Sequence, residues 1–353
     1  MNNLPPAGGT RPKGPGMVRR KAINTAAENM VNIQLLEAEH LLPLLIQPAT
    51  DGADLVSWAT YNHGLLEQHL HKYGAILFRG FPLHTAEDFE RLITGIAGEP
   101  LEYRERSSPR SQISGNIYTS TDHPADQHIF LHNENSYQRI WPLRICFFCK
   151  VPAQQGGETP IADVRRVYQR IPVEIRERFR EKRILYVRNF GDGLGLSWQT
   201  VFQTTQKQEV EAHCRKAGMD CEWKDDNHLR TRRMGQAVAQ HPQTGELLWF
   251  NHAAFFHITT LEPQVRNILL AQFAQEDLPS NTYYGDGTPI EDSVMDELRY
   301  AYQQETIVFP WQKGDVLLLD NMLTAHGRTP FVGPRQILTG MAMPVEKSAD
   351  SQS

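Results

Sequence analysis

The chain has 353 residues, of which 40% are apolar and 22% charged, and its formal net charge is −5. The acidic balance argues against a basic field that binds nucleic acid, and no apolar run reaches the roughly 18–20 residues of a membrane helix. Four cysteines are too few for a disulfide scaffold in a chain of this length, and the N-terminal stretch lacks the apolar segment of a signal peptide. We therefore expect a cytoplasmic protein with neither a nucleic-acid nor a membrane partner.

Short apolar runs along the chain predict strands with helices between them. Residues 1–20, rich in Pro, Gly, Lys and Arg, are predicted to be a disordered tail. A helical period begins near Ile33, and further helices are expected at 65–71, 86–96, 163–183, 206–217, 263–276 and 291–304. Strands are expected at 74–80, 143–151, 185–190, 246–250, 306–309, 315–320 and 336–341.

These elements favour a mainly β protein with flanking helices, an α+β sandwich or barrel. We expect a single domain over residues 21–346, enlarged by a polar and irregular insertion at about 191–245, and a flexible tail at 347–353. The loop-like stretch 101–135 is long enough to predict a functional role.

One histidine motif stands out among the 14 histidines. Alternate residues of an extended chain point to the same side, so His-x-Asp or His-x-Glu can present two ligands to one metal ion. From the counts of His, Asp and Glu, chance alone gives about one to two such matches, and the chain has one, His132-Asn-Glu134. The motif alone is therefore weak, and its weight comes from the residues around it.

The context of this motif indicates a metal site. His132 follows the apolar run 129–131, and His326 comes a few residues after the apolar strand expected at 315–320. Two histidines and one carboxylate are the ligand set of non-haem Fe(II) oxygenases, which leave the remaining coordination positions open. We therefore predict His132, Glu134 and His326 as Fe(II) ligands.

A cosubstrate such as 2-oxoglutarate needs a cation for its distal carboxylate. Arg335 follows a Gly-Pro turn and opens the last expected strand, which suits a bidentate Arg–carboxylate pair. Thr159 supplies a hydroxyl in the turn of residues 156–160. Arg335 and Thr159 are predicted to bind the cosubstrate.

The strings HNE (132–134), GGETPIAD (156–163) and DNMLTAHGRTPFVGPRQIL (320–338) resemble the TauD/TfdA family of Fe(II)/2-oxoglutarate-dependent dioxygenases. The resemblance implies a double-stranded β-helix, the jelly roll found also in cupins. It implies the iron ligands and the 2-oxoglutarate residues given above, with O2 as the oxidant and Arg328 as a second candidate for the cation. Glu134 in the ligand set also argues against halogenation, because related halogenases lack the carboxylate ligand.

Four further strings, at 105–125, 132–138, 195–204 and 247–257, resemble a subgroup associated with nonribosomal peptides, which includes the syringomycin-pathway type of aspartyl β-hydroxylase. This implies hydroxylation of an unactivated C–H bond of an amino acid, possibly the β-carbon of Asp, in antibiotic or other specialised-metabolite biosynthesis. The substrate is either free or tethered to a peptidyl carrier protein, and the reaction releases succinate and CO2. Epoxidation, desaturation, degradation of a small sulfonate or carboxylate, and an inactive binding protein stay open, as does the oligomeric state.

Polar and aromatic residues near the expected site are candidates for substrate binding: Arg110, Asn116, Arg188, Trp198 and Asn251. For each of them a loop hydrogen bond or ordinary packing is at least as good an interpretation. Cys146 and Cys149 lie three residues apart in an expected strand, so they should point to opposite faces and act as core thiols. His252 and His257 match no common metal motif.

Overall fold

The computed structural model describes residues 30–37, 39–102, 110–191 and 195–346, so the tails expected at 1–20 and 347–353 lie outside the described residues. The largest sheet has eight strands in the order β1-β2-β3-β17-β7-β20-β5-β4. In chain order these strands are β1 (Val31–Leu35), β2 (Leu44–Pro48), β3 (Ala75–Phe78), β4 (Gln112–Ser114), β5 (Ile117–Thr119), β7 (Ile140–Val151), β17 (Val316–Asp320) and β20 (Gln336–Glu346).

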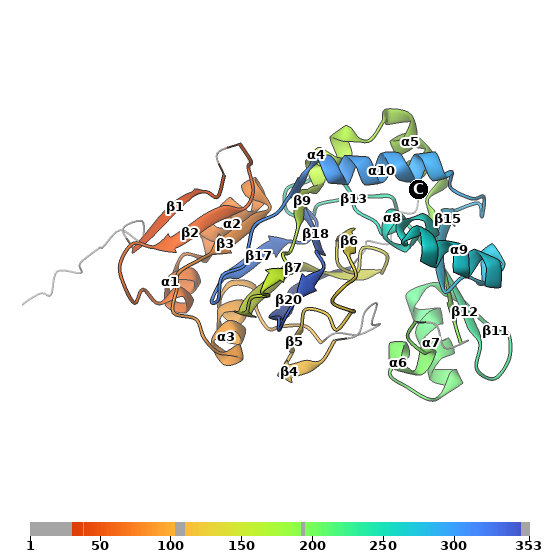
Figure 1. Cartoon of the computed structure of the whole chain (residues 1–353), viewed down its shortest axis with the longest axis horizontal. Helices are drawn as coiled ribbons and strands as arrows, with labels where there is room; N and C mark the ends of the chain where they lie inside the picture. The colour runs from red at the N-terminus through yellow and green to blue at the C-terminus, as the bar shows by residue number, and fades with distance from the viewer. Residues whose placement is uncertain (1–29, 38, 103–109, 192–194, 347–353) are drawn as a thin grey trace, which may run out of the picture.

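A second sheet faces the first, with four strands in the order β16-β9-β18-β6. They are β6 (Ile129–His132), β9 (Ile161–Asp163), β16 (Thr306–Ile307) and β18 (Thr324–Arg328). Phe147 and Leu317 of the large sheet and Ile161 and Ile307 of the small one belong to one buried apolar cluster, which places a core between the sheets. The two sheets form the double-stranded β-helix that the family resemblance implied (Figure 1).

Strand β7 is apolar along nearly its whole length because both of its faces are buried. Ile145, Phe147 and Cys149 point between the sheets, whereas Cys146 and Phe148 pack toward the helices on the outer face. The cysteines therefore lie on opposite faces, as predicted, and burial raises the pKa of each thiol to about 12. The outer face is covered by α1 (Leu55–Tyr61), α2 (His63–Tyr73) and α3 (Ala86–Ala97).

A third sheet lies on the other side of the molecule, in the order β11-β12-β10-β15 (Figure 1). Its strands are β10 (Ile184–Phe190), β11 (Met219–Trp223), β12 (Leu229–Gly235) and β15 (Ser280–Tyr284). With α6 (Trp198–Phe202) and α7 (Lys207–Ala217) it encloses a small core that includes Trp198, Val210 and Leu229. The stretch 191–245 is thus more regular than its polar composition suggested, because a few spaced apolar residues suffice for this core. That it is an insertion into a single domain of residues 21–346 stays our proposal.

The remaining elements connect these sheets. They are β8 (Gln155–Gly156), β13 (Val238–Gln240), β14 (Leu247–Trp249) and β19 (Phe331–Val332), the helices α4 (Val164–Arg170), α5 (Val173–Lys182), α8 (Ala253–Phe256), α9 (Pro263–Gln272) and α10 (Asp292–Gln304), and the 3-10 turns η2 (Ile258–Thr260) and η3 (Gln275–Asp277). Within the described ranges, no helix has both the length and the apolar character needed to cross a membrane.

The helix expected near Ile33 was wrong, because that segment forms β1 and pairs antiparallel with β2. The apolar and polar residues of 31–35 alternate, which is the period of a strand. The loop-like stretch 101–135 contains three short strands, β4, β5 and β6. The helix expected over 163–183 is split into α4 and α5 just before Val173, where Pro172 removes a backbone donor.

Candidate metal centre

The two histidines of the predicted triad face each other across a pair of antiparallel strands. His132 ends β6, and His326 in the middle of β18 is its direct partner in the register. Their ring centroids lie 4.5 Å apart, and Glu134 Oε2 lies 3.9 Å from His326 Nε2. One ligand atom from each of His132, Glu134 and His326 lies within 4.8 Å of the others. Segments almost 200 residues apart in the chain therefore meet at one point.

The chemistry of these three side chains fits a divalent iron ion. The Nδ1 atom of His132 lies 2.9 Å from the carbonyl oxygen of Phe130, so Nδ1 carries the proton and Nε2 keeps its lone pair for a metal. The buried Nδ1 of His326 has no hydrogen-bond partner among the described residues. Burial lowers the pKa of His132, and burial together with His132 and Arg110 lowers that of His326, so both imidazoles are neutral and able to act as ligands.

The backbone of Glu134 is held by the side chain of Asn321. The amide oxygen of Asn321 accepts from Glu134 N–H at 2.8 Å, and its NH2 group donates to the carbonyl oxygens of Glu134 at 2.9 Å and Pro142 at 2.8 Å. In return, Asn133 donates to the backbone oxygen of Asn321 at 2.6 Å. Asn321 is fully buried, so this pairing joins the end of β17 to the loop that carries the metal carboxylate.

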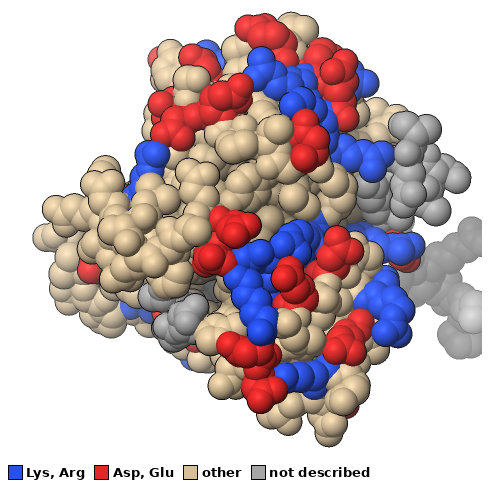
Figure 2. Space-filling view, turned by 90° about the vertical axis from the view of Figure 1, so that its right-hand side faces the viewer, with Lys and Arg blue, Asp and Glu red and all other residues tan. Residues whose placement is uncertain are grey.

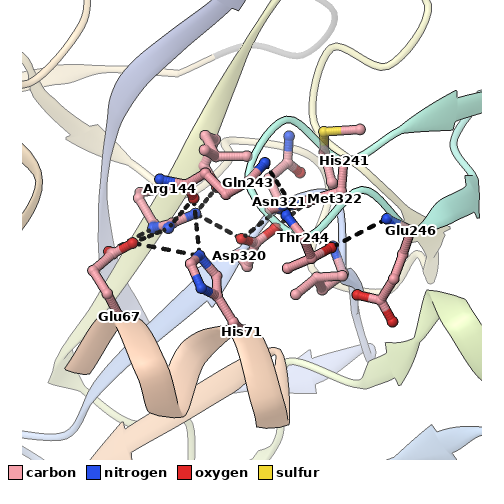
Figure 3. Close-up of polar contacts among 12 residues, drawn as sticks. Glu67, His71, Arg144, His241, Gln243, Thr244, Glu246, Asp320, Asn321 and Met322 are labelled. Carbon is pink, nitrogen blue, oxygen red and sulfur yellow. Dashed lines mark hydrogen bonds and ion pairs between the residues drawn. The ribbon is translucent and has the colours of Figure 1, made fainter. Parts of the chain in front are cut away.

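A buried charge cluster fixes the turn in which Asn321 lies (Figure 3). Asp320 accepts from the N–H groups of Met322 at 3.0 Å and Leu323 at 3.1 Å, and it forms an ion pair of 2.6 Å with Arg144. His241 Nε2 lies 3.0 Å from the same carboxylate. Burial opposes ionisation of Asp320, but Arg144 and His241 outweigh it and hold the pKa of this carboxyl below its usual value.

The tip of Glu134 is held separately, by Arg110. A terminal nitrogen of Arg110 lies 2.7 Å from Glu134 Oε2, and both side chains are buried. Arg110 was a candidate for substrate binding, but the structure places it on the metal carboxylate. Such contacts to a ligand orient it and adjust its charge.

The pairing of β8 with β19 brings Arg335 next to the turn that contains Thr159. Arg335 donates from Nε to the carbonyl oxygen of Gly157 at 2.8 Å, and a Cβ at Gly157 would lie 2.9 Å from Arg335 Cδ. Thr159 is buried, and its hydroxyl oxygen accepts from Trp311 Nε1 at 3.2 Å. Burial, together with the charge of Arg328, lowers the pKa of Arg335 to about 10, as expected of a cation whose counter-ion comes from a ligand.

The side chain of Arg328 has other partners. Its terminal nitrogens donate to the carbonyl oxygens of His123, Pro124 and Gln127. Arg328 therefore anchors the loop before β6 next to the cosubstrate residues, and Arg335 is the better candidate for the carboxylate.

Aromatic residues surround the metal ligands on the side of α8. The ring of Phe255 lies 4.6 Å from that of His132, and the ring of His252 lies 5.6 Å from it. His252 Nδ1 is 2.7 Å from the hydroxyl of Ser136, and Asn251, another substrate candidate, accepts from Ala253 N–H at the start of α8. Asn251 therefore helps to position the start of α8.

The other substrate candidates divide into two groups. Asn116 donates to the carbonyl oxygen of Pro100, and Trp198 packs against Trp223 in the small core under the third sheet. Neither has a contact with the metal ligands among the described residues. Arg188 differs, because it lines a cavity and lies near enough to His252 for its charge to help burial and His132 lower the pKa of that imidazole.

Sequence reasoning missed several residues of the site, among them Asn321, His252, Phe255 and Trp311. Asn321 directly follows a buried strand that ends in Asp320, and this position was the one feature of the sequence that could have indicated a role for Asn321. The other three come from α8, from the residue before it and from a loop before β17, and no local pattern relates them to His132.

Known proteins resemble this chain over most of its length. The family model described as "Taurine catabolism dioxygenase TauD, TfdA family" matches residues 37–342. The dapdiamide synthesis protein DdaC of Enterobacter agglomerans is 43% identical over 316 residues, which cover 86% of this chain and 96% of DdaC. A clavaminate synthase-like protein of Arabidopsis thaliana is 31% identical over 291 residues, covering 78% of this chain and 83% of that protein.

Solved structures share the fold. The crystal structure of PvcB from Pseudomonas aeruginosa has a TM-score of 0.53 at 16% identity and covers 89% of this chain and 91% of its own. AAD-2 in complex with Mn(II) and N-oxalylglycine has a TM-score of 0.53 at 15% identity and covers 90% of this chain and 99% of its own. The chain therefore belongs to the TauD/TfdA family and is a dioxygenase that depends on Fe(II) and 2-oxoglutarate.

Proposed function

We propose that this dioxygenase hydroxylates an unactivated C–H bond of an amino acid in the biosynthesis of a specialised metabolite such as a nonribosomal peptide. The observation that supports this most is the 43% identity to DdaC, whose name assigns it to dapdiamide synthesis. The overall reaction converts 2-oxoglutarate and O2 into succinate and CO2 and places one oxygen atom on the substrate. The first substrates to test are aspartate and aminoacyl groups on a peptidyl carrier protein, and we propose a cytoplasmic location.

The triad and its supports would prepare the metal site. His132, Glu134 and His326 would hold the iron, which supplies the activation of O2 and of the C–H bond. Asn321 fixes the backbone of Glu134, and Arg110 restricts its carboxylate. The backbone contacts are already formed in the described structure, so the loop that carries Glu134 needs little reorganisation when the ion binds.

The cosubstrate and the substrate would lie on different sides of the triad. Arg335 and Thr159 would bind the distal carboxylate of 2-oxoglutarate, with Arg328 anchoring the adjacent loop. The rings of Phe255 and His252 beside His132 would exclude water from the substrate side.

The test is an assay of succinate formation with protein that has been loaded with Fe(II) under anaerobic conditions. Free aspartate and other amino acids are compared with the same residues on a carrier protein, and mass spectrometry reads the product. Gain of one oxygen on a saturated carbon supports hydroxylation, whereas gain of oxygen on an alkene or loss of two hydrogens shows epoxidation or desaturation. If no amino acid, free or carrier-bound, stimulates succinate formation, the proposed substrate class is wrong.

A further inference from the structure

The arginines on the two faces of the third sheet differ in whether they have acidic partners. Successive residues of a strand point to opposite faces, so Arg230 and Arg232 of β12 share one face while Thr231 and Arg233 share the other. Arg230 pairs with Asp277 at 2.5 Å, and Arg232 pairs with Glu222 at 2.7 Å. Figure 2 shows this side of the molecule, where positively charged Lys and Arg side chains are interspersed with negatively charged Asp and Glu side chains.

Arg188 of β10 has no such acidic partner. It is half-buried, and its guanidinium lies 4.9 Å from the centre of the Phe190 ring. Among the described residues it forms neither a hydrogen bond nor an ion pair. A guanidinium carries five N–H donors, and leaving them unpaired in a partly desolvated place is costly. This makes Arg188 a candidate for a ligand that brings its own negative charge.

A second cation and a hydroxyl lie beside Arg188 on the same face. Arg188 is opposite Thr231 in the register of β10 with β12, and Arg233 is its diagonal neighbour. The guanidinium of Arg233 lies 5.9 Å from the centre of the Tyr137 ring and donates to the Tyr137 carbonyl oxygen at 3.4 Å. Two guanidinium groups and a hydroxyl on one face suit a carboxylate or a phosphate.

These side chains line a narrow cavity of about 20 Å³, whose walls include Tyr137 and Tyr186. This is room for about one water molecule, so an anionic group of the substrate would have to replace solvent and displace side chains there. Tyr137 connects the cavity to the metal centre, because its ring lies 4.9 Å from that of His252, which in turn lies 5.6 Å from that of His132. The rings of Tyr137 and His252 thus lie in succession between the cavity and His132.

We propose that Arg188, with Arg233 beside it, binds an anionic group of the substrate. The inference rests on the proposed function and adds the charge of the substrate to it. Two sources share this chemistry: a carboxylate of the amino acid itself and the phosphate of a carrier protein's phosphopantetheine arm. Both present oxygen atoms that a guanidinium can bind in a forked geometry.

The experiment measures binding rather than turnover. Protein loaded with Mn(II) and N-oxalylglycine is titrated with L-aspartate, with L-asparagine and with 4′-phosphopantetheine, and the shift in Tm reports binding. The variants are Arg188→Ala, Arg188→Lys, and the control Arg232→Ala, which removes a cation from the other face of the same sheet. Loss of a charge-assisted pair predicts about 10–100-fold weaker binding in Arg188→Ala, with Arg188→Lys between it and the wild type.

Each result decides the proposal. A response that is lost in Arg188→Ala and kept in Arg232→Ala supports the proposal. If only aspartate gives it, Arg188 binds the side-chain carboxylate; if aspartate and asparagine both give it, Arg188 binds the α-carboxylate that they share; and if phosphopantetheine gives it, Arg188 binds the phosphate. An equal response in Arg188→Ala and the wild type overturns the proposal, as does the absence of any response to the acidic probes in wild-type protein that binds Mn(II) and N-oxalylglycine. Failure of wild-type protein to bind Mn(II) and N-oxalylglycine would instead overturn the proposed function itself, and this inference with it.

Discussion

Asn321 offers a direct test of how the metal carboxylate is positioned. Its side chain forms three hydrogen bonds with backbone groups, two of them with Glu134. The Asn321→Ala variant would leave these three buried groups without partners, at about 1 kcal/mol or more for each, so the free energy of unfolding should fall by about 3 kcal/mol or more. In Asn321→Asp, an oxygen would face the carbonyl oxygens of Glu134 and Pro142, which replaces two attractive contacts by repulsive ones.

Because Asn321 holds the ligand loop, both variants should also bind metal about 10–100-fold more weakly. Equilibrium dialysis with Mn(II) measures this affinity, and urea denaturation measures stability. A matched control is Thr339→Val, which removes a buried side-chain-to-backbone hydrogen bond from β20 to Cys146 and should cost about 1 kcal/mol without changing metal affinity. If the Asn321 variants lost stability but bound Mn(II) like Thr339→Val, Asn321 would only support the fold.

Three further predictions follow from the site. His132→Ala and Glu134→Ala should each abolish metal-dependent succinate formation and weaken Mn(II) binding, and full activity of either variant would show that the triad is misassigned. Arg335→Ala should raise the KM for 2-oxoglutarate by about 10–100-fold, with little change in Mn(II) affinity, and an unchanged KM would move the carboxylate site elsewhere. The folded state holds the pKa of Asp320 below its ordinary value of 3.8, so its contribution to stability is present above that pH and is lost as the pH falls further. Asp320→Asn should therefore lose stability less steeply than the wild type below about pH 4 in urea denaturation, and parallel curves would contradict the assignment to Asp320.

The metal ligands were predictable from the sequence because the signal was local at both ends. His132 and Glu134 are two residues apart, and His326 comes a few residues after an apolar, buried strand. The register that sets the two imidazoles opposite each other was not predictable, because β6 and β18 are short and far apart in the chain. Pairing of this kind is decided by how the whole sheet packs, which local patterns do not report.

The supporting residues were harder to predict for the same reason. Arg110 lies in a stretch that was predicted from the sequence to be a loop, and only the folding of the chain brings it next to Glu134. Near Ile33 the alternation of apolar and polar residues indicates a strand better than it indicates a helix. That strand is mostly exposed, so its pattern of apolar residues is weak. Local sequence patterns therefore identified the candidate metal ligands. They did not identify the residues that hold those ligands in place, because tertiary contacts bring these residues together.

Glu134 is held at both ends, and this has a consequence for the metal-free protein. Asn321 fixes its backbone, while Arg110 neutralises its carboxylate at 2.7 Å. A carboxylate buried without a partner would destabilise the fold strongly, so the Arg110 pair lets the protein fold before the metal binds. The ion must then share Glu134 with Arg110. Metal affinity in this site would thus depend on how the carboxylate of Glu134 is shared between one guanidinium and one divalent ion, which accounts for a basic residue buried beside a site for a cation.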